Sequence, residues 1–329
     1  MAEQQNRARR RLLSWRNVER CGLFVLWLAV VILSAAGYWG REDWRLDLLA
    51  NFKMQYYLGA LVLCVVTAWR SFRILLGLSL LLLLWNGILI FNFALQSSET
   101  SGRVYRAISA NVYTRNTQID RVTAWIREQE PDFVALIEIT DAWMPTLEEL
   151  KDVYPYERRQ MWGGRYGSVV LSKYPPTAEG ASHSYAGVGS LPYEVMTPDG
   201  PLIILLMHPL SPTNERSWKY RKNALGAIAK YVTDNADRAP MLVMGDMNTT
   251  PWSPFYTDFV AQSELNPVVT SFLPRRTWPT HNPFLWVPID HFFLTDQLAP
   301  VNEWTGPDVG SDHYPIGLDF YFATQSEAK

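Results

Sequence analysis

Polar and titratable residues recur in this sequence at the ends of short apolar runs. Asn111 closes the run AISAN, Glu138 lies near the end of FVALIEI, and His208 follows LIILLM. The remaining members follow or begin later runs, and they are Asp246, Asn248, Asp290, Asp312 and His313. A charged group beside a buried strand is costly unless it is paired or bound to metal, and loops at strand ends are where a rigid scaffold presents functional groups. These residues are therefore the candidates for chemistry.

This set combines carboxylates, carboxamides and imidazoles, so it is rich in oxygen donors. Hard oxygen ligands fit Mg²⁺ or Mn²⁺, whereas a zinc site more often brings cysteine or a denser histidine cluster. A hard cation beside histidine and asparagine donors suits reactions at a phosphoryl group, whose developing negative charge these groups can stabilise. The residue types predict metal-dependent phosphoryl chemistry.

The elements that must position these residues follow from hydrophobic patterning. Apolar runs predict strands at residues 104–112, 133–139, 168–171, 202–207, 241–244, 289–294 and 315–322. Amphipathic stretches predict helices at 117–130, 141–150 and 215–235, and another that opens at 253–254. Interleaved strands and helices predict an α/β core with layered sheets.

As an ordered set, the motifs resemble the endonuclease/exonuclease/phosphatase superfamily. The resemblance rests on SANV, PDFVALIEI, GSVVLSKYP, MHP, VMGDMNTTPWSP, IDHFF and GSDHYP, between residues 104 and 322. Each motif alone is weak, but their order, each at a strand end, is specific. The superfamily includes exonuclease III, pancreatic-type deoxyribonuclease, inositol polyphosphate 5-phosphatases and neutral sphingomyelinases, and the likeness is strongest to bacterial membrane-anchored members. It implies an α/β sandwich of two packed β-sheets flanked by helices.

The resemblance also implies which residues hold the metal and the phosphate. Glu138 would be the principal Mg²⁺ ligand, with Mn²⁺ as the alternative ion. Asn111 would help to hold metal or phosphate, and Asp312 would lie at or near the metal. Asn248 would bind the scissile phosphate.

The remaining residues would carry the reaction itself. Asp246 would orient and deprotonate the attacking water. His313 would stabilise the pentacovalent transition state and would be held in its tautomer by Asp290, as in other carboxylate–histidine pairs. His208 would donate to a phosphate oxygen or to the leaving group, a position at which family members differ.

Simpler interpretations stand beside these roles. Gly-Asp-Met-Asn is good turn chemistry, and the Asp312-His313 pair could belong to a surface loop. Strand alternation points His291 away from Asp290 and predicts a structural role for it. We expect Arg221, on the long helix at 215–235, to lie on a solvated face together with Lys222.

The first 96 residues predict a membrane anchor. Apolar runs cover residues 21–39, 54–69 and 74–95. A helix rises about 1.5 Å per residue, so about 20 apolar residues cross the hydrocarbon layer. The first and third runs are long enough, and the shorter second run has aromatic residues at its ends, where interfacial aromatics belong. We therefore predict three transmembrane helices in residues 1–96, a linker at 97–103 and a catalytic domain at 104–329.

Basic residues set the expected orientation. Six arginines precede the first span and should stay on the cytoplasmic side. Three crossings then make the protein a multi-pass component of a bacterial cytoplasmic (inner) membrane, with an extracytoplasmic catalytic domain. If residues 54–69 do not span, that domain faces the cytoplasm instead.

Composition narrows the function classes. The chain is 48% apolar with two cysteines, which excludes an intrinsically disordered protein and a disulfide-stapled scaffold. Residues 97–329 carry 19 basic and 27 acidic side chains, a net charge of −8, which disfavours a general nucleic-acid binder. Aromatic residues in loop-like stretches could contact lipid headgroups or the core, and they are Trp162, Trp278, Phe284 and Trp286.

These observations predict a membrane-anchored Mg²⁺-dependent phosphoesterase. It would hydrolyse a phosphodiester or phosphomonoester by metal-assisted attack of water, on a lipid-linked or small substrate beside the bilayer. The alternatives are a membrane-tethered endonuclease or exonuclease and a non-catalytic membrane-bound interaction module. The complete set of metal-binding and water-activating residues argues against the last, and the oligomeric state stays open.

Overall fold

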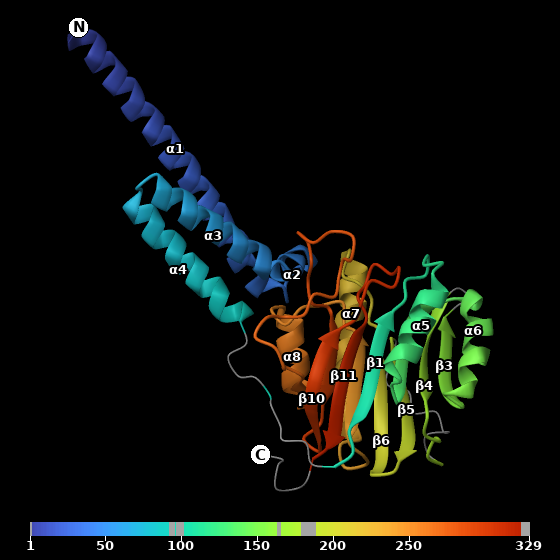
Figure 1. Cartoon of the computed structure of the whole chain (residues 1–329). Helices are drawn as coiled ribbons and strands as arrows, with labels where there is room; N and C mark the ends of the chain where they lie inside the picture. Colours follow the sequence, from blue (N-terminus) through green and yellow to red (C-terminus); the bar gives the residue numbers. More distant parts are fainter. Residues whose placement is uncertain (1, 92–95, 97–101, 163–165, 179–188, 324–329) are drawn as a thin grey trace. The chain divides into compact units, whose positions relative to one another are not determined.

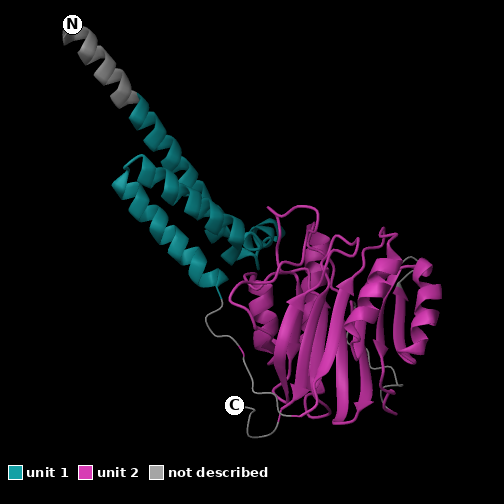
Figure 2. Cartoon of the chain, in the orientation of Figure 1, with its two compact units in different colours: residues 1–91 teal, residues 92–329 magenta. Residues whose placement is uncertain are grey.

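The computed structural model describes residues 2–91, 96, 102–162, 166–178 and 189–323, with side chains from residue 15 onward except that of Trp162, which lies outside the described side chains. The chain forms two compact units, residues 1–91 and 92–329 (Figure 2). Residues 97–101 of the predicted linker lie outside the described residues.

Unit 1 is helical. It contains α1 (Ala2–Ala36), a short 3₁₀ turn (Gly37–Trp39), α2 (Trp44–Ala50), α3 (Lys53–Trp69) and α4 (Arg73–Ile90) (Figure 1). The segments Trp15–Trp39 and Arg73–Ile90 are long and apolar enough to cross a membrane. The pair α2–α3, bent by 60°, makes a third candidate if it counts as one span. The end of the third predicted span, residues 92–95, lies outside the described residues.

Buried polar contacts join the helices of unit 1. Lys53 Nζ at the start of α3 donates to the Ser34 carbonyl oxygen of α1 at 2.6 Å. The hydroxyl of Ser34 donates to Asn86 Oδ1 of α4 at 2.7 Å. Lys53 Nζ also lies 4.7 Å from the ring centre of Tyr38 and 5.4 Å from that of Trp85. Because all three polar side chains are buried, these bonds satisfy groups that apolar surroundings would otherwise penalise.

Unit 2 is built on two mixed β-sheets. The strands are β1 (Tyr105–Asn111), β2 (Phe133–Ile139), β3 (Tyr156–Trp162), β4 (Tyr166–Ser172), β5 (Ser190–Thr197), β6 (Gly200–Met207), β7 (Met241–Asp246), β8 (Asn266–Pro267), β9 (Asp290–Leu294), β10 (Leu298–Thr305) and β11 (Ile316–Phe322). One sheet has the order β10-β11-β1-β2-β4-β3, and the other has the order β5-β6-β7-β9-β8. The pairs β1–β2 and β6–β7 are parallel, and the remaining pairs are antiparallel.

Helices flank the sheets, so the predicted α/β sandwich is confirmed. They are α5 (Ile119–Gln129), α6 (Met144–Glu149), α7 (Glu215–Asp234) and α8 (Pro254–Ser263). Side chains of α5 and α6 share a buried cluster with one face of β1, β2 and β4. On the other sheet, the rings of Phe259 in α8 and Phe293 in β9 lie 5.2 Å apart.

The core between the sheets follows from strand alternation. In β2, Phe133, Ala135 and Ile137 belong to the cluster shared by both sheets. Val134 and Leu136 belong to the cluster under α5 and α6. Successive side chains of a strand point to opposite faces, so a strand covered on both faces reads as one continuous apolar run. This is why the interior strands were visible in the sequence.

Candidate active site

The predicted site residues gather where the core between the sheets opens at one end. Asn111 ends β1, Asp246 ends β7 and Asp290 begins β9. By alternation each continues the face of its strand that packs between the sheets. The β7–β9 register places Asp246 directly opposite Asp290. Asn111 Nδ2 donates to Asp246 Oδ2 at 3.2 Å, which joins the two sheets at this edge.

A β-bulge brings Glu138 to the same edge. In the pairing of β2 with β4, Ile137 faces Ser168 and Ile139 faces Gly167, so Glu138 is the extra residue. Its φ of 64° lies in the left-handed region, a conformation that bulky side chains rarely adopt. Glu138 Oε1 accepts from Asn111 Nδ2 at 3.1 Å, and Oε2 accepts from the backbone N–H of Thr114 at 3.1 Å.

Asp246 is held by the turn that follows β7. Its Oδ1 accepts from the backbone N–H of Asn248 at 2.8 Å, and its Oδ2 accepts from Asn248 Nδ2 at 3.2 Å. The preceding Gly245 has a φ of +142°, and a β-carbon there would overlap the carbonyl oxygen of Met207. Only glycine therefore lets β7 pass β6 closely enough to present Asp246. Burial raises the pKa of the Asp246 carboxyl well above its usual range.

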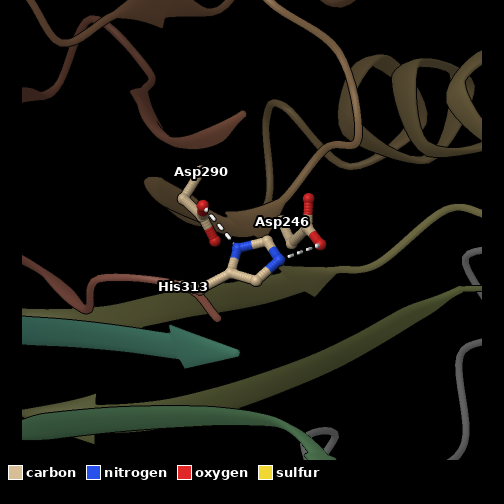
Figure 3. A group of neighbouring side chains, drawn as sticks. All are labelled: Asp246, Asp290 and His313. Atoms are coloured by element: carbon tan, nitrogen blue, oxygen red, sulfur yellow. Dashed lines mark hydrogen bonds and ion pairs between the residues drawn. The ribbon is translucent and has the colours of Figure 1, made fainter. Parts of the chain in front are cut away.

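His313 and Asp290 form a buried pair (Figure 3). His313 Nδ1 lies 2.9 Å from Asp290 Oδ2, and His313 Nε2 lies 3.8 Å from Asp246 Oδ2. Ser311 Oγ accepts from the His313 backbone N–H and donates to the Asn111 carbonyl oxygen, so the loop is tied to β1. Burial lowers the pKa of His313, but the carboxylates of Asp290 and Asp246 outweigh it and raise this pKa above its usual range. The imidazolium is thus the favoured form.

His208, directly after β6, completes the arrangement. Its Nε2 lies 3.7 Å from Glu138 Oε1 and 3.8 Å from Asp246 Oδ2. Burial lowers the pKa of His208, and Glu138 opposes that effect. The two histidines are therefore driven in opposite directions, one toward the neutral imidazole and the other toward the cation.

Asp312 is placed differently from the other predicted residues. Its Oδ2 accepts from Trp278 Nε1 at 3.2 Å. Within the described residues it forms a hydrogen bond with neither Glu138 nor Asp246. A ligand role for Asp312 stays a prediction, whereas the structure brings the other seven residues of the set together.

Arg221 is buried, which corrects the expectation of a solvated face. Its side chain is 0% exposed, its Nη1 donates to the Asn248 carbonyl oxygen at 2.8 Å, and its guanidinium lies 5.1 Å from the ring centre of Phe255. The residue that Arg221 bonds, Asn248, has a φ of 51° in the left-handed region, so Arg221 helps to hold this turn. The sequence pattern does indicate that Arg221 is buried, because Trp218, Arg221 and Leu225 follow the helical spacing of a buried stripe.

The donor chemistry of this edge fits a hard divalent cation. Glu138 is about one quarter exposed at its side chain, and the Asp246 carboxylate beside it is buried. Two adjacent carboxylates create excess negative charge that a cation would neutralise. The described residues contain one group of three ionisable ligands whose atoms lie within 4.8 Å of one another, namely Asp246, Asp290 and His313. In this group His313 Nδ1 already bonds Asp290 at 2.9 Å.

Comparison with solved structures shows the same fold. Danio rerio TDP2 in complex with a single-strand DNA product has a TM-score of 0.52 at 18% identity, covering 67% of this chain and 100% of that chain. The human Nocturnin catalytic domain with a bound sulfate anion has a TM-score of 0.52 at 16% identity, covering 68% and 97%. An endonuclease/exonuclease/phosphatase from Beutenbergia cavernae has a TM-score of 0.51 at 20% identity, covering 68% and 72%.

Sequence comparison gives the family directly. No curated protein matches the sequence significantly. The model of the Endonuclease/Exonuclease/phosphatase family matches residues 108–313, a range that runs from β1 through His313 and includes every candidate site residue. The chain is therefore a member of the endonuclease/exonuclease/phosphatase family.

Proposed function

We propose that this protein is a membrane-anchored, divalent-metal-dependent phosphoesterase that acts on a lipid-linked or small phosphoester. The observation that supports this proposal most directly is the set of nitrogen atoms around Asp246 Oδ2. Asp246 Oδ2 lies 3.2 Å from the side-chain nitrogens of both Asn111 and Asn248, and 3.8 Å from Nε2 of both His208 and His313. A carboxylate at the centre of such donors suits a general base that orients water beside a phosphoryl group.

Each side chain then has a role that its position supports. Asp246 takes a proton from the attacking water, and Asn248 donates to a phosphate oxygen from the next turn. The imidazolium of His313 stabilises negative charge that develops on the phosphoryl oxygens, while Asp290 holds its tautomer. The neutral imidazole of His208 bonds a phosphate oxygen or the leaving group.

Glu138 and Asn111 would hold the cation, Mg²⁺ or Mn²⁺. Once bound, the cation supplies positive charge that polarises the phosphoryl group. Asn111 Nδ2 donates to both Glu138 and Asp246. This one side chain therefore lies between Glu138, the proposed metal ligand, and Asp246, the proposed general base. Asp312 is the remaining candidate ligand, through movement of its side chain away from Trp278.

The candidate spans of unit 1 support a membrane anchor. We propose that this membrane is a bacterial cytoplasmic (inner) membrane and that unit 2 lies outside the cytoplasm. A reporter fused after Lys329 tests this topology. Alkaline phosphatase, active only outside the cytoplasm, should be active in this fusion, and green fluorescent protein, which fluoresces on the cytoplasmic side, should be dark. The reverse result would mean that residues 44–69 do not cross.

A membrane-tethered nuclease is the second candidate, and the neighbouring D. rerio TDP2 structure favours it because that protein holds a single-strand DNA product. The net charge of −8 over residues 97–329 weighs against it, since nucleic-acid binding depends on neutralising phosphates.

A substrate panel separates the two activities. Full-length protein in nanodiscs is offered phospholipids, prenyl diphosphates, inositol phosphates, and single-stranded and plasmid DNA, with Mg²⁺ and with chelator. We expect metal-dependent turnover of a lipid or small phosphoester, lost in Glu138→Gln and kept in the exposed control Glu148→Gln. Turnover confined to DNA would establish the nuclease, and no turnover of any substrate would contradict both.

A further inference from the structure

Residues 270–288, which precede β9, differ in composition from the rest of unit 2. This segment, called the apolar loop below, contains four aromatic residues, two arginines and no aspartate or glutamate. It belongs to a unit with eight more acidic than basic residues. A carboxylate-free stretch of this length is suited to contact with a surface that carries negative charge.

The apolar loop exposes large hydrophobic side chains at two places. Phe284 is 81% exposed and its neighbour Leu285 is 44% exposed. Near the start of the loop, Phe272 and Leu273 are each about half exposed. Large apolar side chains that gather on a surface mark a contact with a membrane or with a partner.

The loop is bonded to the segment that carries His313. Thr280 donates its backbone N–H to the Asp312 carbonyl oxygen at 2.9 Å, and the backbone N–H of Tyr314 donates to Thr277 at 2.7 Å. Within the loop, Trp278 and Val287 pair through reciprocal backbone bonds that close its tip. These backbone bonds fix the position of the loop relative to the segment that carries His313, and so relative to the candidate active site.

A short tether connects the base of the loop to a candidate span. Gln96 accepts from the backbone N–H of Val269 through Oε1, donates its own N–H to the Val269 carbonyl oxygen, and donates Nε2 to Pro267. Helix α4 ends at Ile90, six residue steps before Gln96. Six steps reach at most about 20 Å whatever the arrangement of the two units. The residues immediately before the loop thus stay close to the bilayer that holds α4.

One of the two arginines of the loop, Arg276, suits the same surface. Arg276 donates to the Tyr314 hydroxyl at 2.8 Å, and its guanidinium lies 4.6 Å from the centre of the Tyr314 ring. Among the described residues, no carboxylate forms an ion pair with Arg276. Arg275 pairs with Glu303 and holds the loop to β10. A segment that carries both a guanidinium and exposed aromatic and aliphatic side chains has the combination found where proteins enter the headgroup region of a bilayer.

From these observations we infer that the apolar loop inserts Phe284 and Leu285 into the lipid headgroup region of the bilayer that holds the anchor. The active site then faces phosphoesters carried by lipids at that surface, a conclusion about substrate that rests on the phosphoesterase activity proposed above.

Site-directed labelling tests the insertion without any measurement of activity. In full-length protein with Cys21→Ser and Cys64→Ala, an environment-sensitive fluorophore is attached at Phe284→Cys. The matched control is Met196→Cys, which is also an exposed apolar position. Met196 in β5 pairs with Pro201 near the start of β6, whereas the candidate site residue His208 follows the end of β6. In nanodiscs with spin-labelled phospholipid, we expect quenching and a blue shift at 284 and neither at 196.

Two other results would overturn the inference. If aqueous iodide quenches position 284 as strongly as position 196, the tip lies in water. If neither iodide nor spin-labelled lipid quenches position 284, the tip packs against protein instead of lipid. Both results leave the phosphoesterase proposal intact, because neither depends on turnover.

Turnover gives the second readout. The double substitution Phe284→Ser/Leu285→Ser should lower kcat/KM for phospholipid in the same nanodiscs about tenfold, the factor that corresponds to about 1.4 kcal/mol of lost contact. Hydrolysis of soluble bis(p-nitrophenyl) phosphate should stay unchanged, as should both activities in Met196→Ser. An equal loss on the soluble substrate would show that the loop shapes the catalytic groups and not lipid access.

Discussion

Asp290 Oδ2 lies 2.9 Å from Nδ1 of His313, and both side chains are almost fully buried. The pair joins the first residue of β9 to the loop before β11. Because Nδ1 is engaged by the carboxylate, Nε2 is the nitrogen that faces Asp246 at 3.8 Å. One contact thus sets both the orientation of the imidazole and its preference for the charged form.

Replacement of Asp290 by asparagine should disable this arrangement while preserving its shape. The amide can present an N–H to Nδ1, which favours the wrong tautomer and removes the charge that stabilises the imidazolium. By analogy with other carboxylate–histidine pairs, we expect kcat to fall about 10²- to 10⁴-fold with KM little changed. Steady-state kinetics on the substrate identified by the panel measure this, with thermal unfolding alongside. Asp152→Asn, in an exposed ion pair with Arg127, is the control, and near-parental kcat in Asp290→Asn would contradict the assignment.

Asp246→Asn should separate activity from stability. Burial raises the pKa of the Asp246 carboxyl, with a smaller contribution from Asp290, so a neutral side chain of equal size removes the cost of burying this charge. We expect catalysis to be lost and the thermal midpoint of chelated protein at pH 8 to rise by about 2–4 °C, the shift expected for about 1 kcal/mol in a unit of this size. Scanning calorimetry of both proteins tests this, and an unchanged or lower midpoint would show that Asp246 is not strained in the metal-free fold.

The sequence predicted the interior of each sheet but none of its edges. The predicted strands correspond to β1, β2, β4, β6, β7, β9 and β11, the inner strands of the two sheets. The outer strands, which the sequence did not predict, are β3, β5, β8 and β10. An edge strand needs no continuous apolar run, and it tolerates proline and charge. Accordingly β3 contains Glu157, Arg158 and Arg159, and β10 contains Pro300 and Glu303.

The site was predictable where a polar residue continues a buried strand face, as Asn111, Asp246 and Asp290 do. Glu138 breaks this alternation, and only the bulge, which cannot be read from residue spacing, explains how it reaches the edge. The charge of Arg221 predicts a solvated position, whereas its spacing on the helix matches the buried stripe. The bond of Asp312 to Trp278 depends on the apolar loop folding back, a long-range contact that no local pattern predicts.

Arg221→Met should weaken both the fold and the reaction. It removes the donor to the part-buried Asn248 carbonyl oxygen and leaves that acceptor without this bond, at a cost of about 1–3 kcal/mol. Because the same turn carries Asn248 Nδ2 and the Asp246 carboxylate, kcat should fall as well. Lys222→Met, on the exposed side of the same helix, is the matched control for unfolding and for kinetics. If the two variants behave alike, Arg221 contributes only apolar packing.

His291 should make stability depend on pH. Its ring is buried and its Nε2 lies 2.9 Å from the Thr249 carbonyl oxygen, and burial lowers its pKa below the ordinary value of 6.5. As the pH falls through about 6.5, the unfolded chain takes up a proton that the folded protein refuses, so stability is complete above this pH and declines below it, by at most about 1.4 kcal/mol per pH unit. His291→Gln retains a donor to Thr249 without titrating. Between pH 7.5 and 5.5 the thermal midpoint of the parent should therefore fall by about 2–4 °C more than that of the variant. Since His208 is common to both proteins, equal slopes would mean that His291 binds its proton equally well in the folded and unfolded states.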